Sequence, residues 1–164
     1  MTKKQDQETS RLDSMLCFTV YSTAHAFNRA YKPLLDALDL TYPQYLAMFA
    51  LWEENDITVK EMGERLHLDS GTLTPLLKRL EAMGLVRRAR DTADERNVRI
   101  SLTPAGETLH QKEQTVRKGI VGACAISPEE LQALARQLVK VRDKLNEGLP
   151  LAQNSMREVA AHPA

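Results

Sequence analysis

The chain has 164 residues, of which 43% are hydrophobic and 27% charged, with 22 basic and 22 acidic side chains. These proportions are typical of a folded globular protein and exclude a largely disordered chain. Because the formal net charge is zero, the overall charge gives no reason to expect binding to nucleic acid, and charge has to be compared segment by segment.

The cysteines and histidines exclude two kinds of site. Two cysteines, Cys17 and Cys124, are too few for a disulfide framework, and the scattered histidines have no ligand spacing. We therefore expect no metal and no cofactor.

The N-terminus lacks the apolar core of a signal peptide, and no apolar run is long enough to span a bilayer. We expect a cytoplasmic protein that does not bind membranes.

The first part of the chain is predicted to be helical after a flexible start. Residues 1–11 are polar and expected to be flexible. Residues 12–32 have helical periodicity, and Pro33 is expected to end that helix because proline disfavours helical geometry at the residue before it. A short helix is predicted over 34–40, and another begins near residue 42.

Two helices follow in the order of a helix-turn-helix. The first covers about 57–68, with Thr58 as its N-cap and Glu61 completing a capping box. The second covers about 69–83, with Gly84 placed to cap its C-terminus. Its buried face is predicted from helical spacing to consist of Leu73, Leu76, Leu77 and Leu80.

Two short strands, 85–90 and 97–102, are predicted next, joined by the polar segment DTADER. A helix-turn-helix followed directly by a hairpin is a winged helix. Another helix begins after Thr103, and Gly119 and Gly122 are expected to bend or interrupt it.

A final helix is predicted up to about residue 149. It is capped by Ser127 with Glu130, and Pro128 suits its first position. The fold class is therefore mostly α with a small β-hairpin wing.

The strongest functional signal lies in the helix-turn-helix and wing. The second helix of such a motif enters the major groove and reads bases with residues near its N-terminus. Between residues 70 and 90 there are five basic residues and one acidic residue. The face opposite the leucines carries small, hydroxyl and basic residues suited to DNA: Ser70, Gly71, Thr72, Thr74, Pro75, Lys78 and Arg79. We predict DNA binding rather than a merely solvated face.

The segment after this helix adds three candidate contacts. Arg88 lies in the first strand, and Asp94 and Arg96 lie at the hairpin tip. An arginine at a wing tip can enter the minor groove, and a neighbouring carboxylate can fix its orientation.

Residues 58–107, TVKEMGERLHLDSGTLTPLLKRLEAMGLVRRARDTADERNVRISLTPAGE, resemble the winged-helix core of the multiple antibiotic resistance regulator (MarR) family. The wing of that family carries Asp-x-Arg followed by a strand ending in Leu-Thr, matched here by Asp94, Arg96 and residues 102–103. The stretches DSGTLTPLLKRLE and LCFTVYSTAHAFNRAYKPLLDALDLTYPQY resemble the organic hydroperoxide resistance regulator (OhrR) branch, of the two-cysteine type.

The resemblance implies a homodimeric repressor that binds an inverted-repeat operator and releases it when a reactive cysteine is oxidised by an organic hydroperoxide. Cys17 matches the reactive cysteine, and Cys124 matches a resolving cysteine that forms an intersubunit disulfide with it. Tyr31 and Tyr42 match tyrosines that hydrogen-bond to the thiolate, and Tyr21 matches another tyrosine near the site.

The expected organisation follows from this resemblance. Residues 12–45 and 105–150 are expected to form dimerisation helices and 46–104 the winged helix-turn-helix. Residues 151–164 are expected to form a flexible tail.

Helix geometry bears on Cys17 independently. Tyr21 lies four residues on, so its phenol can reach the sulfur within one chain. Tyr31 lies fourteen residues on, about 21 Å away along a continuous helix. It can therefore contact Cys17 only across an antiparallel pairing of two chains. Without the resemblance, Cys17 would be read as a buried structural thiol and Cys124 as a helix-packing residue.

The residues expected around Cys17 are apolar, which would favour organic hydroperoxides over hydrogen peroxide. They are Leu16, Phe18, Val20, Met48, Phe49 and Trp52.

Two other functions are compatible with the sequence. One is a MarR-type repressor released by a bound phenolic ligand, with Cys17 incidental. The other is a thiol peroxidase, in which the basic helix would have no role; we therefore do not expect an enzyme.

Overall fold

The computed structural model describes residues 11–161 except 13, 92–93 and 95, and gives only the backbone of 149–161. The residues expected to form a flexible N-terminus lie outside this range, apart from Arg11. The described chain divides into two compact units, split between Ala123 and Cys124. Its elements are α1 (Leu16–Asp36), α2 (Tyr42–Glu53), β1 (Ile57–Thr58), α3 (Val59–Leu66), α4 (Ser70–Ala82), β2 (Val86–Arg90), β3 (Val98–Leu102), α5 (Pro104–His110), α6 (Glu113–Cys124) and α7 (Pro128–Ala161).

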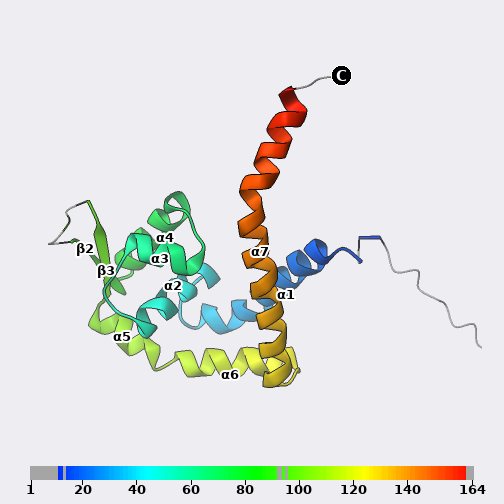
Figure 1. Cartoon of the computed structure of the whole chain (residues 1–164). Coiled ribbons are helices and arrows are strands. Elements are labelled where there is room, and N and C mark those ends of the chain that lie inside the picture. The colour runs from blue at the N-terminus through cyan, green and yellow to red at the C-terminus, as the bar shows by residue number, and fades with distance from the viewer. Residues whose placement is uncertain (1–10, 13, 92–93, 95, 162–164) are drawn as a thin grey trace, which may run out of the picture. The chain divides into compact units, whose positions relative to one another are not determined.

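The winged helix predicted from the sequence is present in the first unit. Strands β2 and β3 form the antiparallel hairpin, with Arg88 opposite Ile100. The hairpin lies beside α3 and α4 (Figure 1). A short strand that the sequence did not predict, β1, pairs with the other edge of β3, which gives the sheet order β1-β3-β2.

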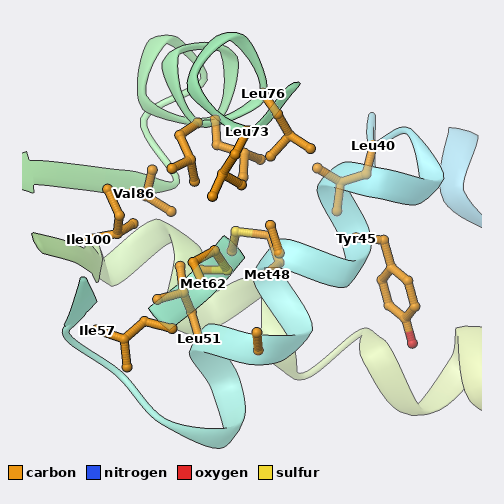
Figure 2. Close-up of a cluster of buried hydrophobic side chains, with 14 of the residues drawn as sticks. Leu40, Tyr45, Met48, Leu51, Ile57, Met62, Leu73, Leu76, Val86 and Ile100 are labelled. Carbon is orange, nitrogen blue, oxygen red and sulfur yellow. The ribbon is translucent and has the colours of Figure 1, made fainter. Parts of the chain in front are cut away.

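The core of this domain lies between α4, α2 and the sheet. All four leucines predicted for the inner face of α4 are buried, and Leu77 is only 1% exposed. Figure 2 shows Leu73 pointing from α4 toward Met48 and Met62, and Leu76 pointing toward Leu40, with side chains of the strands beside Leu73. The apolar positions of several helices and of all three strands thereby close a single core.

Three of the predicted helix caps are confirmed. Thr58 and Glu61 form a reciprocal capping box at the start of α3, in which the Glu61 N–H donates to Thr58 Oγ1 over 3.1 Å. Ser127 and Glu130 do the same for α7. Gly84 follows α4 with a φ of 72°, a left-handed conformation that favours glycine.

Helix α1 begins and ends four residues later than predicted, at Leu16 and Asp36. It runs unbroken through Pro33 to Asp36, so the separate short helix over 34–40 does not exist. Leu35 is 1% exposed in the winged-helix core, and Leu34 packs against α6. This burial outweighs the hydrogen bond that Pro33 removes, while its ring stays exposed to solvent.

The break expected at the two glycines is also misplaced. The chain leaves helical geometry at residues 111–112, between α5 and α6, and α6 continues through Gly119 and Gly122. Gly119 serves close packing instead, because a Cβ there would lie 2.7 Å from Leu34 Cδ2.

Two of the expected boundaries fall inside helices of the structure. The boundary at 45/46 falls inside α2, whose residues Tyr45 and Leu51 belong to the winged-helix core, so α2 is part of that domain. Helix α7 extends to Ala161, so helical backbone occupies most of the expected flexible tail. Residues 151–161 contain three alanines and one each of Leu, Gln, Met, Arg and Glu, all of which favour helix.

Candidate functional site

The candidate DNA-reading helix is α4, and its N-terminus is capped by Asp69. The Asp69 carboxylate accepts hydrogen bonds from the Thr72 N–H at 2.9 Å and from the Thr72 hydroxyl at 3.1 Å. These two bonds hold the pKa of Asp69 below its ordinary value. The cap therefore orders the first turn of the helix, the turn that reads bases in a helix-turn-helix.

The structure places the predicted contact residues of α4 on its outer face. Ser70, Gly71, Thr72, Pro75, Lys78 and Arg79 are exposed, and Thr74 is half-buried. The helix runs unbroken through Pro75.

A groove of about 630 Å³ lies among α3, α4 and the wing. Ser70 and Thr74 line it from α4, and Arg88 and Arg96 line it from the hairpin. The hydroxyl groups and the arginines thus face a common hollow, as a phosphate backbone or base edge requires.

The wing tip has the predicted carboxylate-arginine arrangement. Arg96 donates to both carboxylate oxygens of Asp94, from Nε over 3.0 Å and from Nη2 over 3.2 Å. The guanidinium holds the pKa of Asp94 below its ordinary value. The Arg96 side chain is nevertheless 90% exposed, so its orientation is fixed while its outer face stays open to a ligand.

Arg88, like Thr74, is only partly exposed. Its side chain is 23% exposed and lies 3.7 Å from the Glu81 carboxylate, which also accepts the backbone N–H of Arg88. This pair connects the C-terminal turns of α4 to β2. Arg88 therefore helps to hold the wing against the reading helix as well as lining the groove.

Cys17 lies in the first turn of α1 and is exposed. Backbone N–H groups at a helix start lack intrahelical partners and favour a negative charge nearby. Tyr21, one turn on, packs edge-to-face on His25 at 4.4 Å between ring centroids and stacks on Phe18 at 6.5 Å. Cys17 is thus an accessible thiol on an aromatic helix face and not a buried structural thiol.

The other two predicted tyrosines lie together at the far end of α1. The rings of Tyr31 and Tyr42 are 4.7 Å apart, and Tyr31 lies 5.8 Å from Tyr45. Burial raises the pKa of Tyr42, which keeps its hydroxyl protonated as a hydrogen-bond donor. Because α1 is continuous, about 21 Å of helix separates Tyr31 from Cys17 of the same chain.

The apolar surroundings expected for Cys17 are only partly correct. Phe18 is half-buried near it in α1, but Met48 is completely buried in the winged-helix core. Phe49 and Trp52 lie with Tyr45 at 6.1 and 6.3 Å between ring centroids. The prediction is wrong for Met48, because the sequence did not show which face of α2 joins the core.

Sequence reasoning missed a buried polar pair that adjoins these tyrosines. The Tyr45 hydroxyl donates to Glu113 Oε1 over 3.3 Å, and Arg117 donates to the same oxygen over 3.1 Å. Glu113 is 3% exposed at the start of α6. Burial of the phenol, and after it the nearby Glu113 carboxylate, raises the pKa of Tyr45. Figure 2 shows the Tyr45 ring pointing away from the leucine cluster.

Cys124 is the last residue of α6, is half-buried and begins the second compact unit. Cys17 belongs to the first unit, so the two predicted redox residues lie in different units.

Within residues 11–161, outside the gaps noted above, no three His, Cys, Asp or Glu side chains are grouped to hold a metal. The same part of the chain contains no helix with the length and apolarity needed to cross a bilayer.

Comparison with known proteins gives matches over most of the chain. A family model for the transcriptional regulators SarA/Rot matches residues 29–115. The chain is 51% identical over 146 residues to the HTH-type transcriptional regulator TtmR of Methylorubrum extorquens, covering 89% of this chain and 75% of TtmR. It is 47% identical over 137 residues to the organic hydroperoxide resistance transcriptional regulator of Bacillus subtilis, covering 84% and 93%.

Among solved structures, the fold is similar to that of AbfR of Staphylococcus epidermidis. The overoxidised AbfR bound to DNA superposes with a TM-score of 0.68 at 37% identity, covering 85% of this chain and 98% of AbfR. The reduced AbfR bound to DNA gives the same TM-score and identity. These relatives are transcriptional regulators and not enzymes.

Proposed function

Because the chain belongs to the MarR family of winged-helix transcription regulators, and within it to the organic hydroperoxide resistance type, we propose that it is a redox-sensing repressor. It binds an inverted-repeat operator as a reduced homodimer and releases it when an organic hydroperoxide oxidises Cys17. The observation that carries this proposal is an exposed thiol in the first turn of α1, combined with two packed tyrosines at the other end of that helix.

A homodimer is supported by the apolar residues that single helices leave exposed. On α1 these include Leu16, Val20 and Phe27. On α7 they include Leu134, Leu138, Val141 and Leu145, whose spacing places them on one helix face. A second copy of the chain would bury both faces, and two reading helices about 34 Å apart would fit successive major grooves.

The proposed chemistry uses the two cysteines in sequence. The Cys17 thiolate attacks the terminal oxygen of the hydroperoxide, the O–O bond breaks, and the alcohol leaves after taking up a proton. This step oxidises Cys17 to a sulfenic acid. The Cys124 thiol of the partner subunit then attacks the Cys17 sulfur, water leaves, and an intersubunit disulfide forms.

Three tyrosines would support this chemistry by donating hydrogen bonds to the thiolate. Tyr21 can do so within one chain, and Tyr31 and Tyr42 from the partner. Both of the latter pack on or near Tyr45, which belongs to the winged-helix core. A displacement of Tyr31 on oxidation would therefore be passed to α2, change the spacing of the reading helices and weaken operator binding.

The proposed DNA contacts are Ser70, Thr72, Thr74, Pro75, Lys78, Arg79, Arg88 and Arg96, with Asp94 orienting Arg96. Since operator DNA is the partner, the cytoplasm is the proposed location.

A gel-shift assay with DNA from upstream of the protein's own coding region tests the proposal. The reduced protein should bind, and cumene hydroperoxide should release it. Cys17→Ser should bind DNA but ignore the hydroperoxide. Non-reducing electrophoresis should show an oxidised dimer that Cys124→Ser abolishes.

Two outcomes would favour the other functions. Release by an aromatic acid but not by cumene hydroperoxide would indicate a repressor controlled by a phenolic ligand. Sustained peroxide turnover with a thiol reductant, without DNA binding, would indicate a thiol peroxidase.

A further inference from the structure

Arg99 in β3 bridges two acidic residues that lie far apart in the sequence. Its Nε donates to Asp56 Oδ1 over 3.0 Å, and its Nη1 donates to Asp91 Oδ2 over 3.2 Å. Its Nη2 also donates to the backbone carbonyl of Asp56. Each of the three guanidinium nitrogens therefore has an acceptor, and the planar group is held at two ends.

One of these acceptors, Asp91, leads to the wing tip. Asp91 follows β2, and its other carboxylate oxygen, Oδ1, lies 3.4 Å from the Asp94 N–H that donates to it. Its N–H donates to the Asn97 carbonyl over 2.9 Å, and the Asn97 N–H donates to the Asp94 carbonyl over 2.9 Å. Both carboxylate oxygens of Asp94 in turn accept hydrogen bonds from the Arg96 guanidinium. The Arg99 guanidinium is thus joined to Arg96 through Asp91 and Asp94.

The other acceptor, Asp56, leads to the helix-turn-helix. It lies between α2 and β1 with a φ of 61°, a left-handed conformation uncommon for aspartate. The preceding Asn55 accepts the Leu102 N–H over 2.8 Å, and the following strand β1 pairs with β3 and leads into the Thr58 cap of α3. Asp56 is therefore fixed to the body that carries α4.

We propose that Arg99 is a positioning residue that fixes the direction of the wing tip, and hence of Arg96, relative to the reading helix α4. It links the body through Asp56 to the tip through Asp91.

Direct contact of Arg99 with DNA is a poorer explanation of this arrangement. Its side chain is 35% exposed, against 90% for Arg96. Asp56 and Asp91 surround it with more negative than positive charge, which opposes the approach of a phosphate. Arg96, with one carboxylate on one side, keeps an open face. The two arginines thus have different roles, one in holding the wing and one in contacting DNA.

A double-mutant cycle on operator affinity tests this assignment. Arg99→Gln removes the bridge, and Arg99→Lys keeps the charge but cannot donate to both acids in one plane. In the reduced protein each should weaken operator binding about three- to tenfold, which lies in the lower part of the range of coupling between residues that share a network. In an Arg96→Ala background each substitution should weaken operator binding less than about twofold. The side chain that loss of the bridge would misplace, Arg96, is already absent there.

The exposed Arg90 at the end of β2 provides a matched control. Arg90→Gln should weaken operator binding by the same factor with and without Arg96, because an independent charge acts additively. Equal losses for Arg99→Lys in both backgrounds would overturn the proposal, because Arg99 would then act without Arg96. Circular dichroism melting of each variant checks folding. If Arg99→Gln does not fold, Arg99→Lys and Asp56→Asn complete the cycle.

Discussion

The proposed site shared between two chains can be tested by separating Cys17 and Tyr31 onto different protomers. One protomer carries Cys17→Ser and the other carries Tyr31→Phe, with different purification tags so that the heterodimer can be isolated. Cys124→Ser in both chains stops the reaction at the sulfenic acid. The heterodimer then has one reactive thiol, on the chain that has Phe at position 31.

The magnitude follows from the geometry of α1. Fourteen residues of continuous helix place Tyr31 about 21 Å from Cys17 of its own chain, far beyond hydrogen-bond distance. A hydrogen bond to a charged group contributes about 1.5–3 kcal/mol, and about 1.4 kcal/mol corresponds to tenfold in rate. Losing the phenol should therefore slow oxidation of Cys17 about tenfold or more.

The assay is the rate at which cumene hydroperoxide converts Cys17 to a sulfenic acid, trapped with a dione reagent and measured by mass spectrometry. The Tyr31→Phe homodimer should be slow because both of its sites lack the phenol. The heterodimer should react at the rate of the protein with both residues, since its Cys17 meets Tyr31 of the other chain. A heterodimer as slow as the Tyr31→Phe homodimer would refute the shared site.

Two further predictions concern the winged-helix domain. A Cβ at Gly106 would overlap the Leu85 carbonyl oxygen, so Gly106→Ala should lower the free energy of unfolding by about 1–3 kcal/mol. Thermal melting checks this, with Gly122→Ala as the control because a Cβ there has no atom within 4 Å. Equal melting temperatures for the two variants would show that Gly106 is not closely packed. Asp69→Asn should match the wild type near pH 7, since asparagine is an equally good N-cap. Because the Asp69 pKa is lowered in the folded state, the wild type should lose stability relative to this variant as pH falls below about 4; parallel losses in melting curves would contradict the charge contribution.

Local signals predicted much of the fold. The leucine spacing of α4, the caps at Thr58 and Ser127, and Gly84 after α4 each depend on residues within one or two helical turns. The wrong predictions concern helix ends that depend on packing between residues far apart in the sequence. Pro33 stays in α1 because Leu35 beyond it is buried in another part of the domain, and Gly119 meets Leu34 from a distant segment.

The candidate sites divide in the same way. The Asp94–Arg96 pair was predictable because its members are two residues apart. The Asp56–Arg99 and Tyr45–Glu113 contacts join residues 43 and 68 positions apart, and no local pattern indicates them. The position of Tyr31 relative to Cys17 was predictable because one helix contains both and helix rise is constant.

The central claim is that oxidation of Cys17 itself releases the operator. Fluorescence anisotropy of labelled operator DNA, titrated with cumene hydroperoxide while mass spectrometry follows Cys17, tests it most directly. Loss of bound DNA should follow the oxidised fraction of Cys17, be complete near about one equivalent of oxidant per chain, and be absent in Cys17→Ser. DNA that stays bound when Cys17 is fully oxidised, or equal release from Cys17→Ser, would contradict it.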